Sequence, residues 1–421
     1  MIRHTHVVLM SVMMTLAACS GSQVRPDSAP VAVVEGSGPV AEESTEIRMD
    51  PMLIRATVDD NGRVSSQTYE IPQLFAEAND YLEAGDHANA LRLYDMILDS
   101  TTADNWRQVT LYNSSLALEG LGDIRNAQRQ YEVLVQDWPH SEDARWACFR
   151  LAEIAAMEGR YADVIPWMDH VLAYTQIPVA DRVEAHIRTG FARLEQRQFS
   201  QAVNQFQAGL TVNEQASGWE PGQSASLRPL AATDEWVAQA HYGLGRVYHL
   251  LFSQIRLVLP REQLERDLVD KGQLLETAEA NYLNSVRTGH PYWGPAAGYM
   301  VGQMYEGFYF DILATEVEPQ FNELEVEVYF ELIRESIRPA IDRAISIYES
   351  NLAMAYRMGA SHEWVDSTIS RIQFLQDYVH NQTGWAQEQQ LIVEQRHPHS
   401  ARLGEGMQFR SEQASSRQIA D

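Results

Sequence analysis

The residues that could do chemistry are few, and their spacing matches no common catalytic arrangement. The sequence has two cysteines, Cys19 and Cys148, too few for a disulfide framework or a cysteine-based zinc site. The one close histidine pair of the C-terminal tail, His397 and His399, flanks a proline, which makes metal binding there the weaker interpretation. The sequence lacks a nucleophile elbow, a glycine-rich phosphate loop and an HExxH motif. We therefore predict a protein that is not an enzyme and uses no metal or cofactor.

The densest group of acidic residues lies between positions 316 and 331. A solvated helix face or loop is the simplest interpretation, and a docking patch for a basic partner or a loose cation site is the sharper alternative. The stretch lacks the Asp/Asn-Gly loop of a tight calcium site. Paired carboxylates also serve glycosidases, so a peptidoglycan hydrolase stays as a minor alternative function. The residues are Glu316, Glu318, Glu323, Glu325, Glu327 and Glu331.

The amino terminus has the pattern of a secretory signal over residues 1–18. Arg3 precedes a short apolar run that is too short to span a bilayer. The tetrapeptide Leu16–Cys19 resembles the bacterial lipobox, which implies that Cys19 is acylated and becomes the first residue of the mature chain. Ser20 follows in place of the aspartate that retains enterobacterial lipoproteins in the inner membrane, so the resemblance implies an outer-membrane anchor facing the periplasm. An ordinary secretion signal with a chance cysteine is the alternative.

A pattern of small residues followed by a large, mostly aromatic side chain recurs about every 37 residues. In the first three copies a glycine closes a turn between two helices. In every copy the next marked residue lets the helices approach closely, and a large side chain one helical turn later fills the gap to the next pair. A period in this range predicts a helical array. The copies are Gly85/Ala90/Tyr94, Gly122/Ala127/Tyr131, Gly159/Val164/Met168 and, one residue late, Ala202/Phe206.

This order of small residues, ending at Pro139 in the second copy, resembles the tetratricopeptide repeat. The resemblance covers roughly residues 71–210 and implies an all-α, right-handed solenoid of helix hairpins that acts as a protein-interaction scaffold. Cys148 occupies the position that Leu111 fills one repeat earlier, so we expect a buried apolar role for it.

The second half of the sequence shows the same pattern of small and aromatic residues, with longer and less regular helices. The pattern continues at Ala278/Tyr282 and Ala344/Tyr348. A last amphipathic helix over 364–378 is expected to cap the array. We expect a signal peptide at 1–18, a flexible tether at 19–65, regular repeats at 66–212, a linker at 213–232, degenerate long-helix repeats at 233–380 and a polar tail at 381–421. Four segments carry a further pattern within 235–370: Thr288–Trp293, a helix end at Gly302–Glu306, Ala344–Tyr348 and Gly359–Trp364. This pattern is similar to repeat lipoproteins of myxobacteria and their relatives, some of which belong to gliding-motility machinery.

Two aligned positions on successive first helices line the concave face in the tetratricopeptide family. An aromatic stripe there predicts a groove for an apolar or extended peptide. The alternative is that these side chains pack between neighbouring helices. The eight candidate residues are Phe75, Asn79, Tyr112, Leu116, Phe149, Glu153, Ile187 and Phe191.

The formal net charge is −26, and Lys271 is the only lysine. This acidity argues against a nucleic-acid partner and against a body that lies on anionic lipid. We predict a scaffold or adaptor, lipid-anchored to the outer membrane in the periplasm, whose partners are envelope proteins or peptides, with gliding-motility or trans-envelope machinery as its candidate setting. A factor for outer-membrane protein assembly or for regulation of cell-wall enzymes is the alternative.

Overall fold

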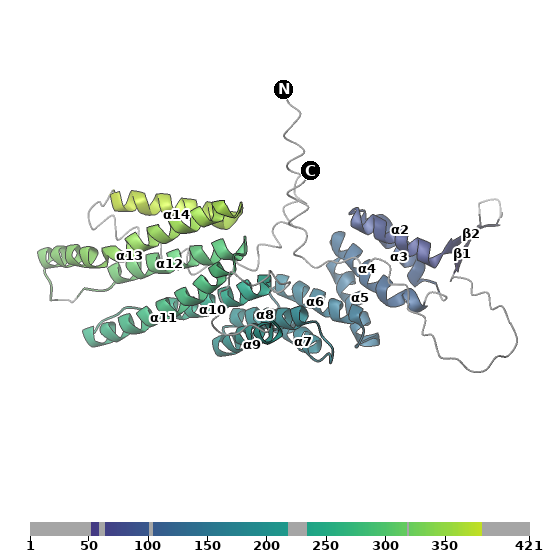
Figure 1. The fold of residues 1–421 in the computed structure, drawn as a ribbon, viewed down its shortest axis with the longest axis horizontal. Helices are drawn as coiled ribbons and strands as arrows, with labels where there is room; N and C mark the ends of the chain where they lie inside the picture. Colours follow the sequence, from purple (N-terminus) through teal and green to yellow (C-terminus); the bar gives the residue numbers. More distant parts are fainter. Residues whose placement is uncertain (1–51, 59–63, 101–103, 218–233, 318–319, 381–421) are drawn as a thin grey trace, which may run out of the picture. The chain divides into compact units, whose positions relative to one another are not determined.

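The segments with the recurring pattern form antiparallel helix hairpins in the computed structural model (Figure 1). The structure describes residues 52–58, 64–100, 104–217, 234–317 and 320–380. The chain divides into two units, Met1–Ile154 and Ala155–Asp421, and the boundary falls inside helix α6 (Glu142–Met157). The described residues contain thirteen α-helices and one two-stranded sheet. This composition confirms the predicted all-α class built of helix hairpins.

The first unit contains two helix hairpins and the start of α6. Within it α2 contacts α3, α3 contacts α4 and α4 contacts α5, and the two first helices, α2 and α4, also contact each other. A short 3-10 turn, Asp104–Trp106, leads into α4. The helices are α2 (Ile71–Glu83), α3 (His87–Leu98), α4 (Arg107–Gly120) and α5 (Ile124–Asp137).

A β-hairpin precedes the first helix and differs from the expected tether. Strands β1 (Met52–Val58) and β2 (Val64–Glu70) pair antiparallel, with Met52 opposite Glu70. The end of the stretch interpreted as an irregular tether, and the first residues assigned to the repeats, therefore form regular structure. Short alternation of polar and apolar residues is a weak signal beside the strong helical period that follows it.

The turns within the repeats have the predicted geometry. Gly85, Gly122 and Gly159 all have positive φ, between 71° and 77°, a conformation that glycine adopts without a Cβ clash. In the first two turns the next residue is an aspartate, and its side chain accepts the backbone N–H three residues later at 3.2 Å. The chain thus ends one helix and caps the next within a few residues.

The fourth turn has no glycine. Arg197 takes the positive φ instead, at 58°. Its backbone N–H still donates to the Leu194 carbonyl at 2.8 Å, so the turn keeps the local hydrogen bonding of a helix end.

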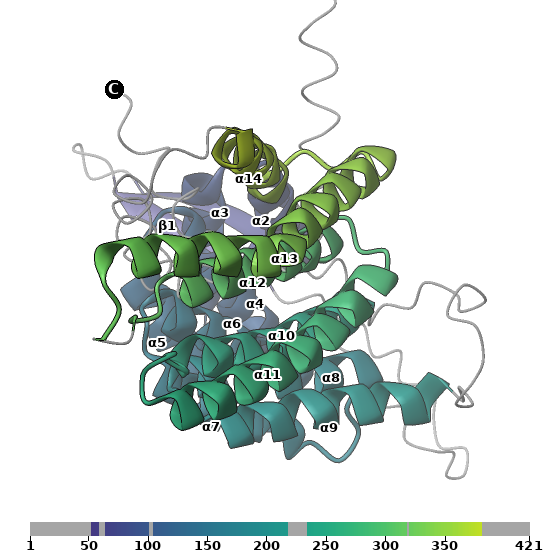
Figure 2. The same ribbon diagram turned by 90° about the vertical axis from the view of Figure 1, so that its left-hand side faces the viewer.

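The second unit continues with longer helices. Its first helices α8, α10, α12 and α14 contact one another in chain order, and each also contacts a second helix, α9, α11 or α13 (Figures 1 and 2). The helices are α7 (Tyr161–Leu172), α8 (Val179–Glu195), α9 (Phe199–Ser217), α10 (Asp234–Gln254), α11 (Arg261–Arg287), α12 (Trp293–Leu313), α13 (Glu323–Arg357) and α14 (Glu363–His380).

One boundary differs from that expected in this half. The linker was expected at 213–232, but α9 continues to Ser217, and α8 to α10 belong to one unit with a single hydrophobic cluster from Val183 to Tyr378. The helix that carries Ala344 begins at Glu323 and continues through Pro339, where the proline predicts an interruption. A capping box on Asn322 fixes its start.

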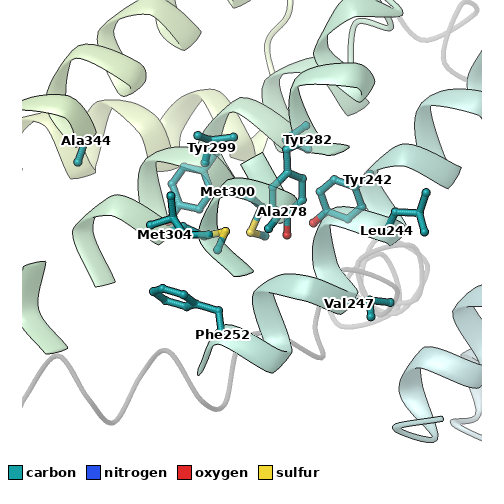
Figure 3. Close-up of a cluster of buried hydrophobic side chains, with 14 of the residues drawn as sticks. Tyr242, Leu244, Val247, Phe252, Ala278, Tyr282, Tyr299, Met300, Met304 and Ala344 are labelled. Atoms are coloured by element: carbon teal, nitrogen blue, oxygen red, sulfur yellow. The ribbon is translucent and has the colours of Figure 1, made fainter. Parts of the chain in front are cut away.

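Large side chains of the second helices pack directly on glycines of the first helices. A Cβ added at Gly190 of α8 would lie 2.7 Å from the Phe206 ring of α9, and one added at Gly302 of α12 would lie 2.5 Å from the Tyr348 ring of α13. Tyr282 of α11 is buried in the same way and lies 5.7 Å, ring to ring, from Tyr242 of α10 (Figure 3). The small residues thus set the distance between helices.

The Arg197 turn gives a test of the backbone argument. Arg197→Gly should stabilise the protein by about 1 kcal/mol, because glycine has no Cβ strain at positive φ. Gly85→Ala should destabilise it by about 1 kcal/mol although nothing lies within 4 Å of the added Cβ. Urea denaturation of the full chain measures both. A loss of stability in Arg197→Gly would show that the arginine side chain matters more than its backbone.

A second pair of variants separates packing from helix propensity. Gly302→Ala should destabilise by about 1–3 kcal/mol, because its Cβ meets the Tyr348 ring. Gly272→Ala, inside α11 with nothing within 4 Å, should stabilise by about 0.5–1 kcal/mol. Thermal and urea unfolding compare the two. Effects of the same sign at both sites would contradict the close-packing account.

Candidate partner-binding surfaces

The predicted groove residues lie on four first helices, two on each of α2, α4, α6 and α8. Seven of the eight are buried, with exposed fractions between 0 and 7%. Glu153 is partly exposed. The buried seven are Phe75, Asn79, Tyr112, Leu116, Phe149, Ile187 and Phe191.

Three of the four aromatic members of this set pack against rings of other elements. The Phe75 ring lies 5.1 Å from the Trp106 ring, Tyr112 lies 5.8 Å from Tyr131, and Phe191 lies 5.0 Å from Phe206. A first helix in a stacked array meets its own second helix and its neighbours, so most of its circumference is covered. The structure therefore favours the packing alternative for these residues over an open aromatic stripe.

The polar members of the set also have structural partners. The Asn79 side-chain oxygen accepts from the Tyr94 hydroxyl at 2.7 Å and from the Asn113 amide at 2.9 Å, which ties α2, α3 and α4 together. Glu153 accepts from the Arg150 guanidinium at 3.0 Å. These contacts occupy the groups that would otherwise be offered to a peptide.

Arg150 lies at the centre of a network that the sequence did not predict. It donates to Glu119 through two nitrogens, one of them at 3.0 Å, and the Tyr131 hydroxyl donates to the same carboxylate at 2.6 Å. Burial works against the charged guanidinium, but Glu153 and Glu119 outweigh it and raise the pKa of Arg150. Burial is also the main reason why the pKa of Tyr131 is raised. The network joins α4, α5 and α6 within the first unit.

Cys148 is buried without a disulfide, as predicted. Burial raises the pKa of its thiol to about 12, so it is protonated and a poor nucleophile at neutral pH. Cys19 and the pair His397/His399 lie outside the described residues.

The acidic run lies at the start of the longest helix. Glu316 is exposed just before it, and Glu325, Glu327 and Glu331 are exposed on α13. Glu325 belongs to the capping box, since its side chain accepts from the Asn322 N–H at 2.8 Å. Glu318 and the side chain of Glu323 lie outside the described residues. The described glutamates thus belong to a solvated helix face and the loop before it, the simpler of the two interpretations, and docking of a basic partner there stays a prediction.

Within the described ranges, no three or more His, Cys, Asp or Glu side chains come together in a group that could hold a metal ion. The same residues include no helix long and apolar enough to cross a membrane.

The only lysine of the sequence is completely buried in the second unit. The Lys271 ammonium donates to the carbonyls of Phe252 at 2.8 Å and Ile255 at 3.1 Å, and it pairs with Asp311 at 2.9 Å. It also lies 3.8 Å from the centroid of the Phe252 ring. Burial lowers its pKa, and Asp311 opposes part of that shift. Lys271 therefore closes the end of α10 and ties it to α11 and α12.

No protein-family model and no curated protein matches the sequence. Solved structures give remote likenesses. A tetratricopeptide repeat protein from Parabacteroides merdae is 13% identical with a TM-score of 0.35, over 71% of this chain and 98% of that one. A TPR repeats protein from Bacteroides fragilis is 15% identical with a TM-score of 0.26, over 74% and 99%. MamA from Desulfovibrio magneticus is 15% identical with a TM-score of 0.32, over 50% and 96%. The fold assignment rests on the helices of this chain.

Lys271→Met tests the structural role of the buried ammonium. The variant leaves two helix-end carbonyls without their donor and should destabilise the second unit by about 2–4 kcal/mol in urea denaturation. In the native chain an amine-reactive reagent should modify Lys271 only on unfolding, as mass spectrometry would show. Labelling of the folded chain as fast as of the unfolded chain would contradict the burial of this side chain.

Proposed function

We propose that this protein is a lipid-anchored scaffold that gathers proteins of the bacterial cell envelope. The observation that carries the proposal is the array itself, in which α8, α10, α12 and α14 contact one another in chain order. An array of this kind presents a continuous series of helix faces, whose outer residues can vary without disturbing the core. That is the geometry of a binding platform.

Several buried polar groups make structural contacts between helices, which supports a scaffold over an enzyme. Glu306 of α12, 1% exposed, accepts from the Tyr348 hydroxyl at 3.1 Å and from Arg371 Nε at 3.2 Å. These bonds join α12, α13 and α14. The networks around Arg150 and Lys271 join helices in the same way.

The envelope setting rests on the sequence. The lipobox-like tetrapeptide ending at Cys19 supports acylation, and multiple acyl chains on one residue suffice for stable anchoring. Ser20 after the cysteine supports the outer membrane and the periplasm. The resemblance over 235–370 supports gliding-motility or trans-envelope machinery as the setting, ahead of outer-membrane protein assembly or cell-wall enzyme regulation.

Cys19→Ser tests the anchor, with Cys148→Ser as the matched control. Cys19→Ser should move the protein from the membrane fraction to the soluble fraction or leave an unprocessed precursor, because the acylated atom is missing. Cys148→Ser should fractionate as wild type. The readouts are membrane fractionation and the mass of the mature amino terminus. Unchanged fractionation and processing of Cys19→Ser would contradict lipid anchoring.

Partner capture tests the scaffold role separately. Amine-reactive crosslinkers are unsuitable, since the only lysine is buried. A photoreactive amino acid at exposed positions of the array should instead capture the same envelope proteins reproducibly. Absence of any captured protein at every exposed position would contradict the scaffold role.

A further inference from the structure

The N-terminal half of α13 carries an apolar stripe on its outer face. Leu324 is 68% exposed, Val328 47% and Leu332 61%, and the two leucines are the most exposed large hydrophobic side chains among the described residues. Their spacing of four residues places them within about 80° of the helix circumference, at roughly 100° per residue. They form a single ridge along the helix.

The register of α13 fixes this ridge on the outside. Phe330, on the opposite face, is only 2% exposed, and Val326 and Ile333 pack against the same hydrophobic cluster. In Figure 2, α13 crosses in front of α12, the helix on which it packs. The helix cannot turn the ridge inward without exposing this inner face.

The fold does not require apolar residues on the outer face. Eighteen residues make five full helical turns, so the same face of the C-terminal half carries Asp342, Ser346 and Ser350. All three are exposed. One helix thus presents a polar outer face in one half and an apolar one in the other, and the difference needs a cause other than packing within this chain.

Carboxylates flank the apolar ridge. Glu327, Glu331 and Glu335 are exposed along one side of it, and none of the three forms an ion pair with another described residue. Residues 323–338 contain five glutamates and two arginines, a formal charge of −3. The outer face of this half of α13 therefore combines an apolar ridge with an acidic border.

We infer that this face of α13 is a docking surface for an amphipathic helix of a partner protein, apolar on the contact side and carrying Lys or Arg along its edge. The inference rests on the proposed scaffold function and names the class of partner for one surface. A ridge of residues four apart packs into the grooves of a crossing helix. The glutamates select a basic partner by charge complementarity.

Charge argues against the other occupants. A second copy of the chain would bring the same glutamates against one another, and an anionic membrane surface would repel them. The C-terminal segment 381–421 contains four arginines and five acidic residues, so it offers no net positive charge to the patch.

The test measures binding of a designed helical peptide to the full chain carrying Cys19→Ser, which needs no detergent. The probe is a fluorescent peptide of about 18 residues, five helical turns, with leucine on one face and lysine elsewhere. A second peptide has glutamate in place of lysine. Two variants alter the patch: Leu324→Gln/Val328→Gln/Leu332→Gln, and Glu327→Gln/Glu331→Gln/Glu335→Gln.

Matched controls lie on α11, where Val269 is 59% exposed and Glu262, Asp270 and Glu276 are exposed. They are Val269→Gln, and Glu262→Gln/Asp270→Asn/Glu276→Gln. Each α13 variant should weaken binding of the lysine peptide by about tenfold or more, while the α11 variants stay within about twofold. Circular dichroism checks that all variants remain helical. The glutamate peptide should not bind.

Several results would overturn the inference. Equal binding by wild type, α13 and α11 variants would show that the peptide recognises net charge alone. Equal affinity of the two peptides would remove the basic-partner argument. Concentration-dependent dimers abolished by the α13 variants would assign the ridge to a second copy. Lysine-peptide binding that appears only after deletion of 381–421 would assign it to the tail. If envelope proteins are still captured at other helices in any of these cases, the scaffold function stands and only this inference fails.

Discussion

A large side chain of each second helix is buried among the neighbouring helices, and the array depends on this packing. Six such side chains are 0% exposed: four tyrosines, one methionine and one phenylalanine. Each follows a small or β-branched residue by four positions. They are Tyr94, Tyr131, Met168, Phe206, Tyr282 and Tyr348. Glycines of the first helices face the rings of Phe206, Tyr282 and Tyr348, so these helices approach closely and each ring fills the remaining space. Each contact involves only neighbouring helices, so the stability of the array is a sum of local terms.

Much of this could be predicted because the signal is local and repeated. The recurring sequence pattern predicts the helix hairpins, their positive-φ glycines and the continuation at Tyr282 and Tyr348. Other features of the fold are not contained in this recurring pattern. Arg197 adopts a glycine-like φ at a turn without a glycine, and α13 continues through Pro339 although its own sequence favours a break. The β-hairpin before α2 was missed because seven-residue strands give a weak pattern.

The candidate site was harder to predict than the fold. Alignment of repeats identifies equivalent positions, but it does not say which neighbour each side chain meets, and the predicted groove residues turn out to pack within the array. The acidic run stands out by its composition, whereas the apolar residues interleaved with it do not. Their signal was present in the sequence: Leu324, Val328 and Leu332 recur every four residues, and polar residues occupy the same helical face five turns later. Reading both halves of α13 on one face requires knowing that it is a single helix.

The most direct test of the central claim is hydrogen exchange of the full chain with and without Tyr348→Ala. The tyrosine joins α13 to α12, and α14 packs on both. If neighbouring contacts alone hold the array, amides of α12, α13 and α14 should exchange faster in the variant, while those of α2 to α5 in the other unit keep their wild-type rates. An equal acceleration in all helices, or no change around the missing ring, would contradict the account.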